Sequence, residues 1–234
     1  MKRNSLITLG ILSLFMLYAC KSDSQGKTNL VVEEFEKGIQ KDKVQVLDVR
    51  TQPEYNSGHL KNAFLADWTN QTVFQERVKY LDKNKPVYTY CLVGGRSAAA
   101  AAWMKQNGFK EVYNLDGGIN AWKRNDKPLE GVQLARQITM DEYLKSIPAD
   151  KTVLVDVGAP WCPPCKVMEP VIKELQDSNK GLFQLVNIDG GEQETLSKGL
   201  GAESFPYFII YKNGKETWRK QGVVASEELL AQLK

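Results

Sequence analysis

Residues 162–165 read Cys162-Pro163-Pro164-Cys165; they follow the apolar run 153–157 (VLVDV) and precede residues 166–169 (KVME). The apolar run is typical of a buried strand, and the prolines suit the first turn of a helix, where the N–H that a proline lacks would have no partner. Cys162 therefore lies at a predicted helix N-terminus, where the helix dipole favours a thiolate. Two thiols in this position favour thiol–disulfide chemistry.

The rest of the second half continues this alternation of helices and strands. From its N-terminal side, the expected elements are a helix at 140–147, a strand at 152–157, a helix at 163–176, strands at 182–188 and 207–211, and a last helix from Ser226. Asn213-Gly214 predicts a hairpin turn after the strand at 207–211. A polar stretch with turn residues precedes this half, and we place a linker there, at residues 126–136.

The first half has its own alternating pattern. Its expected strands are residues 44–49 and 86–90, and its expected helices are residues 72–81 and 97–106. Such alternation predicts a parallel sheet with helices on both faces, whose ligands bind where strands end and helices begin. The chain of 234 residues therefore reads as two α/β domains.

Cys91 stands where one of these strands gives way to a helix, in the segment 91–96 (CLVGGR). Two glycines free the backbone, and a loop that closes onto a helix N-terminus turns its N–H groups inward. A cysteine in such a loop is expected to be a stabilised thiolate and a nucleophile, although a buried, inert thiol is the alternative. Leu92, Val93, Gly94 and Gly95 would form the substrate-binding loop, and Arg96 would favour an anionic substrate.

The first half resembles a single rhodanese (sulfurtransferase) domain, which we place at residues 29–125. The residues that carry the resemblance are LDVR at 47–50 with Glu54, GHL at 58–60 before Ala63, the 91–97 segment, and LDGGINAW at 115–122. The resemblance implies that Cys91 takes up a sulfane sulfur as a persulfide, with Arg96 favouring an anionic donor such as thiosulfate. Asp48, Arg50 and Glu54 are expected to pin the turn after the first strand, and the lone His59 to be structural.

Loop length argues against the rival chemistry of phosphatases with this fold. They need five residues between the cysteine and the arginine, whereas four separate Cys91 from Arg96. A sulfur atom is the better fit. Because Leu92 and Val93 are apolar, a lipid-like or protein-bound persulfide donor stays open beside thiosulfate.

The second half resembles thioredoxin, over residues 137–234. The matching residues are Asp156, the segment 161–166 (WCPPCK), Pro170, the segment 187–189 (NID), Phe205-Pro206 and the segment 212–214 (KNG). The resemblance implies that Cys162 is the exposed attacking thiolate and Cys165 the buried resolving thiol of a redox disulfide. It also implies that Asp156 is a proton carrier beneath them and that Pro206 is a cis proline facing the disulfide.

Some features of this half depart from the resemblance or leave alternatives open. Leu185 occupies the position of the lysine that commonly partners the buried aspartate, so proton transfer through Asp156 is expected to respond differently to pH. Pro-Pro between the cysteines is more like envelope reductases than cytosolic thioredoxins, so we favour a reductase over an oxidase. A zinc site and a structural disulfide are the weaker alternatives; no metal and no cofactor is expected.

Residues 1–19 read as an export signal, with Lys2 and Arg3 before an apolar run. The segment 17–20 (LYAC) resembles the lipobox of bacterial lipoproteins, which implies a lipid on Cys20; an ordinary secretory signal with an incidental cysteine is the alternative. Residues 20–28 would be a flexible leash. The protein is then expected in the periplasm or cell envelope, anchored to the outer rather than the inner membrane because Lys21 follows Cys20.

These features predict an envelope thiol redox and sulfur-transfer protein. Cys91 would acquire a persulfide, Cys162 would attack its outer or inner sulfur, and Cys165 would resolve the product. Expected partners are a sulfane-sulfur donor, envelope proteins with disulfides or persulfides, and a transmembrane thiol-electron carrier as reductant. The near-neutral charge after signal removal argues against nucleic acid. The alternative is a disulfide reductase whose first domain is a docking or sulfide-sensing module without catalysis.

Overall fold

The structure is a computed structural model, and it describes residues 28–131 and 136–234. The expected signal peptide 1–19, Cys20 and all but the last residue of the expected leash lie outside the described residues. Within the described ranges, no helix combines the length and the apolar character needed to cross a membrane.

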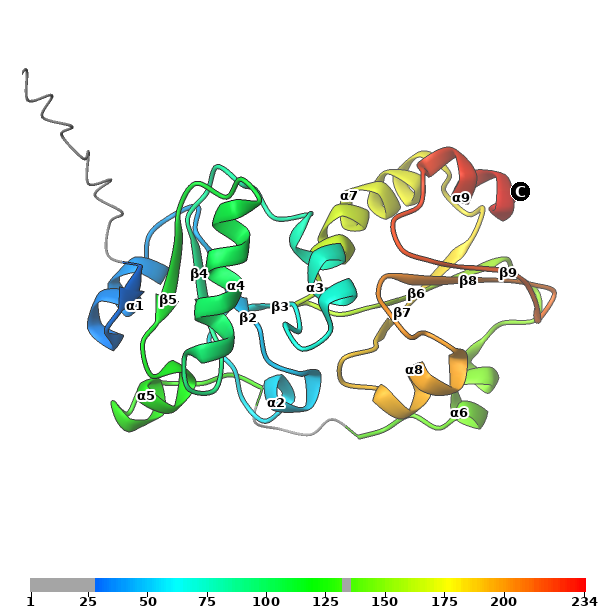
Figure 1. Cartoon of the computed structure of the whole chain (residues 1–234). Coiled ribbons are helices and arrows are strands. Elements are labelled where there is room, and N and C mark those ends of the chain that lie inside the picture. Colours follow the sequence, from blue (N-terminus) through cyan, green and yellow to red (C-terminus); the bar gives the residue numbers. More distant parts are fainter. Residues whose placement is uncertain (1–27, 132–135) are drawn as a thin grey trace, which may run out of the picture.

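The first domain is built on a five-stranded sheet in which all paired strands are parallel, which confirms the predicted class (Figure 1). The strand order across the sheet is β1-β5-β4-β2-β3, so β3 is an edge strand. The strands are β1 (Asn29–Leu30), β2 (Gln45–Asp48), β3 (Phe64–Leu65), β4 (Val87–Tyr90) and β5 (Val112–Leu115). In register, Asp48 on β2 lies beside both Tyr90 on β4 and Leu65 on β3, so the C-terminal ends of these three strands are level.

Helices cover both faces of this sheet. They are α1 (Val32–Ile39), α2 (Gln52–Asn56), α3 (Gln71–Val78), α4 (Gly95–Gln106) and α5 (Gly118–Arg124). Phe74 and Val78 of α3 pack with Met104 of α4 in one core cluster, whereas Phe35 of α1 and Trp122 of α5 belong to another. The predicted helix 72–81 is shorter than expected, because α3 ends at Val78.

The second domain has the mixed sheet that its resemblance implies, in the order β7-β6-β8-β9. Strands β6 and β7 are parallel, and β8 pairs antiparallel with both β6 and β9. In chain order the elements are α6 (Met140–Ser146), β6 (Val153–Gly158), α7 (Pro163–Ser178), β7 (Gln184–Asp189), α8 (Glu194–Leu200), β8 (Tyr207–Lys212), β9 (Lys215–Gln221) and α9 (Ser226–Leu233).

The two domains share one continuous apolar core cluster. Tyr55 and Leu65 of the first domain and Trp161 of the second are members of it, and the rings of Tyr55 and Trp161 lie 5.8 Å apart. The backbone N–H of Leu65 donates to the carbonyl of Trp161 at 2.9 Å, so edge strand β3 is capped by the second domain. Helices α3 and α7 also meet at this boundary (Figure 1).

Polar contacts from α2 add to this boundary. The Asn56 side-chain amide donates to the Gly191 carbonyl at 3.2 Å and to the Glu194 carboxylate at 3.0 Å, and Gln52 donates to Glu194 at 3.3 Å. The domains are therefore docked on each other through both apolar and polar groups.

Part of the expected linker 126–136 is attached to the first domain. Glu130 exchanges two backbone hydrogen bonds with His59, and the Trp122 indole N–H donates to the Pro128 carbonyl at 3.0 Å. The first residues of the expected linker therefore run along the surface of the first domain as far as Glu130.

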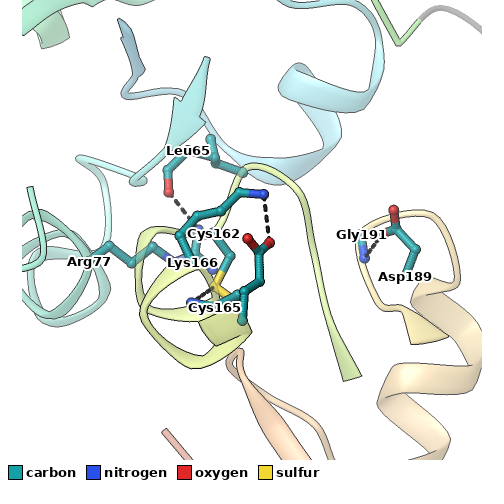
Figure 2. The surroundings of a disulfide bond; sticks show 8 residues. Leu65, Arg77, Cys162, Cys165, Lys166, Asp189 and Gly191 are labelled. Carbon is teal, nitrogen blue, oxygen red and sulfur yellow. Dashed lines mark hydrogen bonds and ion pairs between the residues drawn. A yellow bond between two sulfur atoms is a disulfide. The ribbon is translucent and has the colours of Figure 1, made fainter. Parts of the chain in front are cut away.

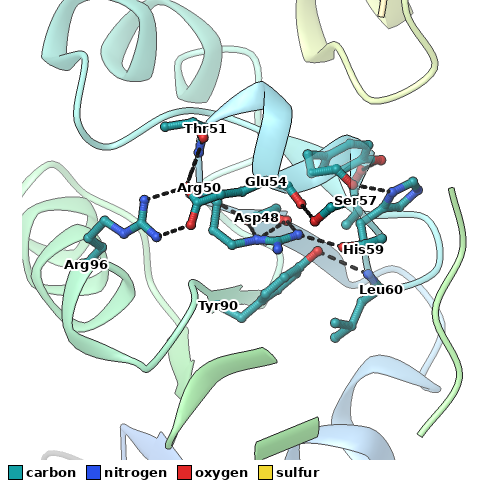
Figure 3. Close-up of polar contacts among 12 residues, drawn as sticks. Asp48, Arg50, Thr51, Glu54, Ser57, His59, Leu60, Tyr90 and Arg96 are labelled. Atoms are coloured by element: carbon teal, nitrogen blue, oxygen red, sulfur yellow. Dashed lines mark hydrogen bonds and ion pairs between the residues drawn. The ribbon is translucent and has the colours of Figure 1, made fainter. Parts of the chain in front are cut away.

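Asp48 and Arg50 form a buried ion pair at the end of β2 (Figure 3). Arg50 Nη2 lies 2.6 Å from the Asp48 carboxylate and 2.9 Å from the Gly58 carbonyl, which ties β2 to the turn after α2. Both side chains are almost fully buried. The pair thus pins the turn, as the sequence predicts.

Removing one partner of this pair is expected to be costly. Arg50→Ala leaves the Asp48 carboxylate buried without a counter-charge, which should lower the free energy of unfolding by about 3–5 kcal/mol. Urea unfolding measures the loss. Lys85→Ala is the control, because its ion pair with Asp82 is exposed and should contribute no more than about 1 kcal/mol. A loss for Arg50→Ala as small as that of the control would contradict the structural role of the pair.

Candidate active sites

Cys91 lies directly after β4, at the start of the loop that leads into α4. Gly94 takes the left-handed conformation (φ 97°) as the residue before the helix, and its N–H donates to Cys91 Sγ at 3.1 Å. Glycine suits this backbone angle, and a Cβ on Gly94 would lie in tight contact, 3.2 Å from the Gly117 nitrogen. The loop therefore closes around the sulfur.

The N-terminus of α5 fixes the outer side of this loop. Ile119 N–H donates to the Cys91 carbonyl at 2.8 Å, and Asn120 N–H donates to the Leu92 carbonyl at 3.1 Å. A side chain on Gly118 would collide with the Cys91 carbonyl. Because glycine has none, α5 can approach the loop this closely. Because the loop carbonyls bind α5, loop N–H groups are left to face the sulfur.

The surroundings of Cys91 favour its thiolate. Burial alone raises the pKa of this thiol, but the Ser97 side chain and the backbone N–H groups of Ser97, Val93 and Gly94 outweigh burial and lower the pKa below its ordinary value. Cys91 itself is buried, whereas Leu92 and Val93 beside it are 39% and 62% exposed. An approaching donor would thus meet an apolar rim with a stabilised sulfur beneath it.

Arg96 faces the loop and is held in place by Glu54 of α2 (Figure 3). Its Nη1 and Nη2 donate to the two Glu54 oxygens at 2.8 and 2.6 Å. This pairing, opposed in part by burial, lowers the pKa of Glu54 to about 2. Glu54 does more than pin the turn: it also orients the arginine at the sulfur-binding loop, a contact that sequence spacing did not reveal.

Cys162 and Cys165 form a disulfide at the start of α7, with Pro163 and Pro164 in the first turn (Figure 2). Cys165 N–H lies 3.3 Å from Cys162 Sγ, so the helix N-terminus points at the first sulfur of the pair. The Phe205–Pro206 peptide bond is cis, and Phe205 packs against Trp161 with the ring centres 5.8 Å apart.

The expected exposure of Cys162 is wrong for this arrangement of the domains. Cys162 is 0% exposed and Cys165 is 9% exposed. The reason is the docked first domain, whose strand β3 hydrogen-bonds to Trp161, the residue next to Cys162. The burial depends on contacts between two domains that are far apart in the sequence, so neither domain's own residue pattern predicts it.

Asp156 on β6 lies beneath the disulfide, next to Cys165. A cavity of about 300 Å³ is lined by both residues and by Glu169 and Asp189. One Asp156 carboxylate oxygen is buried without a hydrogen-bond partner, and burial, aided by the Glu169 charge, raises the pKa of this group to about 6. Such a carboxyl group can hold and release a proton near neutral pH.

Both halves of the chain match known families. Residues 31–125 match the family described as Rhodanese-like domain, and residues 134–234 match the family described as Thioredoxin. A thioredoxin of Rickettsia felis is 31% identical over 98 residues, which cover 42% of this chain and 93% of that protein. The chain belongs to the thioredoxin family. Its thioredoxin domain follows a rhodanese-like domain.

Two further relatives each match one domain. The chloroplastic thioredoxin Y of rice (Oryza sativa) is 35% identical over 95 residues, 41% of this chain and 55% of that protein, so the chain spans about half of it. The tRNA uridine(34) hydroxylase of Cytophaga hutchinsonii is 43% identical over 88 residues, which are 37% of this chain and 28% of that protein. Each of these relatives therefore matches a single domain of this chain.

The raised pKa of Asp156 gives the thioredoxin domain a testable pH dependence. The folded state holds this proton more tightly than the unfolded state, whose pKa is near 3.8, so ionised Asp156 destabilises the fold as pH rises through about 6. Asp156→Asn removes this ionisation and should therefore stabilise the protein more at about pH 8 than at about pH 4. The change that it causes in the free energy of unfolding should be about 2 kcal/mol more favourable at the higher pH. Urea unfolding at both pH values measures this difference; equal effects at the two would contradict the raised pKa.

Among residues 28–131 and 136–234, no three histidine, cysteine, aspartate or glutamate side chains gather as ligands of a metal ion would. His59 stacks on Tyr55, with the ring centres 3.7 Å apart, and its Nδ1 lies 3.2 Å from the Tyr55 carbonyl, so it packs the boundary of the rhodanese-like domain rather than its sulfur site.

Proposed function

We propose that the protein moves sulfane sulfur from a small anionic donor, such as thiosulfate, to a dithiol. The single observation that carries the proposal is the Cys91 loop, in which backbone N–H groups and Ser97 stabilise a thiolate while Arg96 stands beside it. A dithiol pair in the same chain, Cys162 and Cys165, supplies the electrons.

The proposed sulfur transfer from thiosulfate to the Cys162–Cys165 pair takes three steps. The Cys91 thiolate attacks the outer sulfur of thiosulfate, which releases sulfite and leaves a persulfide on Cys91. The Cys162 thiolate attacks the outer sulfur of this persulfide, because the inner sulfur is enclosed by the loop. Cys165 then attacks Cys162, which releases hydrosulfide and leaves the Cys162–Cys165 disulfide. An external dithiol returns two electrons and restores the pair.

The second step requires the domains to part. Cys162 is fully buried in the docked arrangement, beside the point where Leu65 of the rhodanese-like domain contacts Trp161, so a sulfur carried by Cys91 reaches it only in a more open arrangement. Because one chain joins the two domains, Cys91 and Cys162 stay at an effective concentration of about 1 mM while the domains are apart. Opening and closing are therefore part of the proposed cycle.

We further propose that the protein works in the bacterial cell envelope. The supporting features are the export signal that the sequence predicts at residues 1–19 and Cys20, which would carry the lipid anchor, with the outer membrane favoured over the inner. The reductant would then be a transmembrane thiol-electron carrier, and the acceptors would be envelope proteins with disulfides or persulfides.

Product analysis tests the sulfur-transfer step. The reduced protein is mixed with thiosulfate, and sulfite and sulfide are measured. The proposal predicts one sulfite and one sulfide for each Cys162–Cys165 disulfide formed. Disulfide exchange without sulfite would contradict it.

The absence of sulfite would favour the second candidate function, a disulfide reductase with a docking module. The observation behind this candidate is that the rhodanese-like domain already covers Cys162 and exposes Leu92 and Val93 as an apolar rim. In that case the first domain would gate or present substrates to the thioredoxin domain, and Cys91 would take no part in the chemistry.

A further inference from the structure

Arg77, on helix α3 of the rhodanese-like domain, carries a buried charge with too few partners. Its side chain is 8% exposed, and the described residues place no carboxylate in an ion pair with it. One guanidinium nitrogen donates to the Leu65 carbonyl at 3.0 Å, whereas Nε is buried without any hydrogen-bond partner. Burial lowers the pKa of this group to about 10, and the Asp67 charge opposes the shift.

The guanidinium of Arg77 lies against the redox motif of the other domain. Its Cζ is 4.9 Å from the centre of the Trp161 ring, and Trp161 directly precedes Cys162. Leu65 links the same groups through its backbone, because its N–H donates to the Trp161 carbonyl and its carbonyl accepts from Arg77. Figure 2 shows the Arg77 side chain extended from α3 toward the Cys162–Cys165 disulfide.

We propose that Arg77 is the counter-charge for the Cys162 thiolate, supplied to the thioredoxin site by the neighbouring domain. The inference rests on the dithiol chemistry of the proposed function and adds a residue that sets its redox poise. Reduction consumes two electrons and one proton from a dithiol and converts the disulfide into a Cys162 thiolate and a Cys165 thiol. The new negative charge then lies near a buried cation that has no ion-pair partner among the described residues, which stabilises the reduced state.

Other charged groups near the motif do not supply this cation. Lys166 on α7 is exposed and is paired with Glu169 at 2.7 Å. Asp156 on β6 and Glu169 are negative when ionised and would disfavour a thiolate. Asp67, in the rhodanese-like domain, acts on Arg77 rather than on the sulfur. Within the described residues, Arg77 is thus the buried cation at the Trp161 side of the motif.

The placement has a consequence for domain docking. Because Arg77 comes from the rhodanese-like domain, its interaction with the thiolate exists only while the domains are docked. Docking therefore favours reduction, and by reciprocity reduction tightens docking. The reduced protein would close over its own thiolate and protect it until a sulfur donor or substrate opens the domains.

Two measurements on the full chain test the proposal, in a Cys20→Ser, Cys91→Ser background that leaves only the redox pair. The ultraviolet absorbance of the thiolate gives the Cys162 pKa without any reagent that must enter the site. Equilibration with dithiothreitol at about pH 8, followed by acid quenching and mass analysis, gives the reduction equilibrium constant. Arg77→Met should raise the Cys162 pKa by about one unit. It should also lower the equilibrium constant about tenfold, or about 30 mV for this two-electron couple.

Matched variants separate charge from packing. Arg77→Lys keeps the charge and should retain most of the stabilisation. Lys79→Met removes a positive charge beside the same helix, where Lys79 is exposed and paired with Glu76, and should change neither quantity. A Gln52→Ala, Asn56→Ala double variant keeps Arg77 but weakens docking, so it should shift both quantities in the direction of Arg77→Met even if Arg77→Met itself folds poorly.

The proposal would be overturned if the Cys162 pKa and the reduction equilibrium constant were unchanged both in Arg77→Met and in the Gln52→Ala, Asn56→Ala variant. It would also be overturned if Arg77→Met and Arg77→Lys shifted these two quantities equally. These outcomes differ from a failure of sulfur transfer, because the Cys91→Ser background carries no sulfur on that residue. A disulfide that dithiothreitol does not reduce would overturn both the dithiol chemistry and the role of Arg77.

Discussion

Cys162→Ser should abolish disulfide reduction by this protein, with a loss of roughly three orders of magnitude in rate against insulin as a test substrate. The reason is that Cys162 is the sulfur at the N-terminus of α7, where the helix dipole and the Cys165 N–H stabilise its anion, whereas a serine hydroxyl stays protonated at neutral pH. Turbidity of the reduced insulin chains measures the rate.

Two companion variants give this result its meaning. Cys91→Ser should keep insulin reduction, because its loop lies in the other domain. Cys165→Ser should stop turnover by trapping a mixed disulfide between Cys162 and the substrate, visible by mass analysis. If Cys162→Ser still reduced insulin at the parent's rate, Cys162 would not be the attacking sulfur.

Cys91→Ser should reduce sulfite release from thiosulfate to background, again a loss of roughly three orders of magnitude. The N–H groups and Ser97 lower the pKa of the Cys91 thiol below its ordinary value, so the parent rate should fall less steeply as pH drops below about 9 than the rate of a thiol with an ordinary pKa. A colorimetric sulfite assay across this range measures both effects.

Cys162→Ser is the control for this prediction, since it should release one sulfite per chain and then stop. Parent-like sulfite release by Cys91→Ser would show that thiosulfate is cleaved elsewhere. A parent rate that falls tenfold for each pH unit below about 9 would show that the thiol has an ordinary or raised pKa.

Local pattern was enough to predict the parallel sheet of the first domain and to place the reactive cysteines between strands and helices, whereas the mixed sheet of the second domain was implied by its resemblance to thioredoxin. The buried strands β2, β4 and β6 are rich in apolar residues, and Cys91 and Cys162 each follow a strand and precede a helix. These features depend on residues that are close in the sequence, so composition and periodicity reveal them.

Short elements escaped the same reasoning. Strands β1 and β3 have two residues each, too few for any periodicity, and α2 has five residues. The role of α5 was equally hidden, because its N–H groups bind the carbonyls of a loop more than 20 residues earlier in the chain. In each case a tertiary contact, rather than propensity, places the element.

The covering of Cys162 and the burial of Arg77 could not be predicted from either domain alone. Arg77 lies in an eight-residue helix of mixed polarity, where an arginine is ordinarily solvent-exposed. Only the docking of β3 and α3 onto Trp161 encloses both residues. Sequence resemblance treats the two domains as separate units and therefore omits the boundary between them.

The most direct test of the account is a peptide mass spectrum of the protein beginning at Lys21, first reduced and then treated with thiosulfate. The account predicts an added sulfur on Cys91 that persists in Cys162→Ser but is cleared in the parent, where the Cys162–Cys165 disulfide appears at the same time. No added sulfur on Cys91 in either protein would contradict sulfur transfer, and an added sulfur that persists equally in both would contradict the relay between the domains.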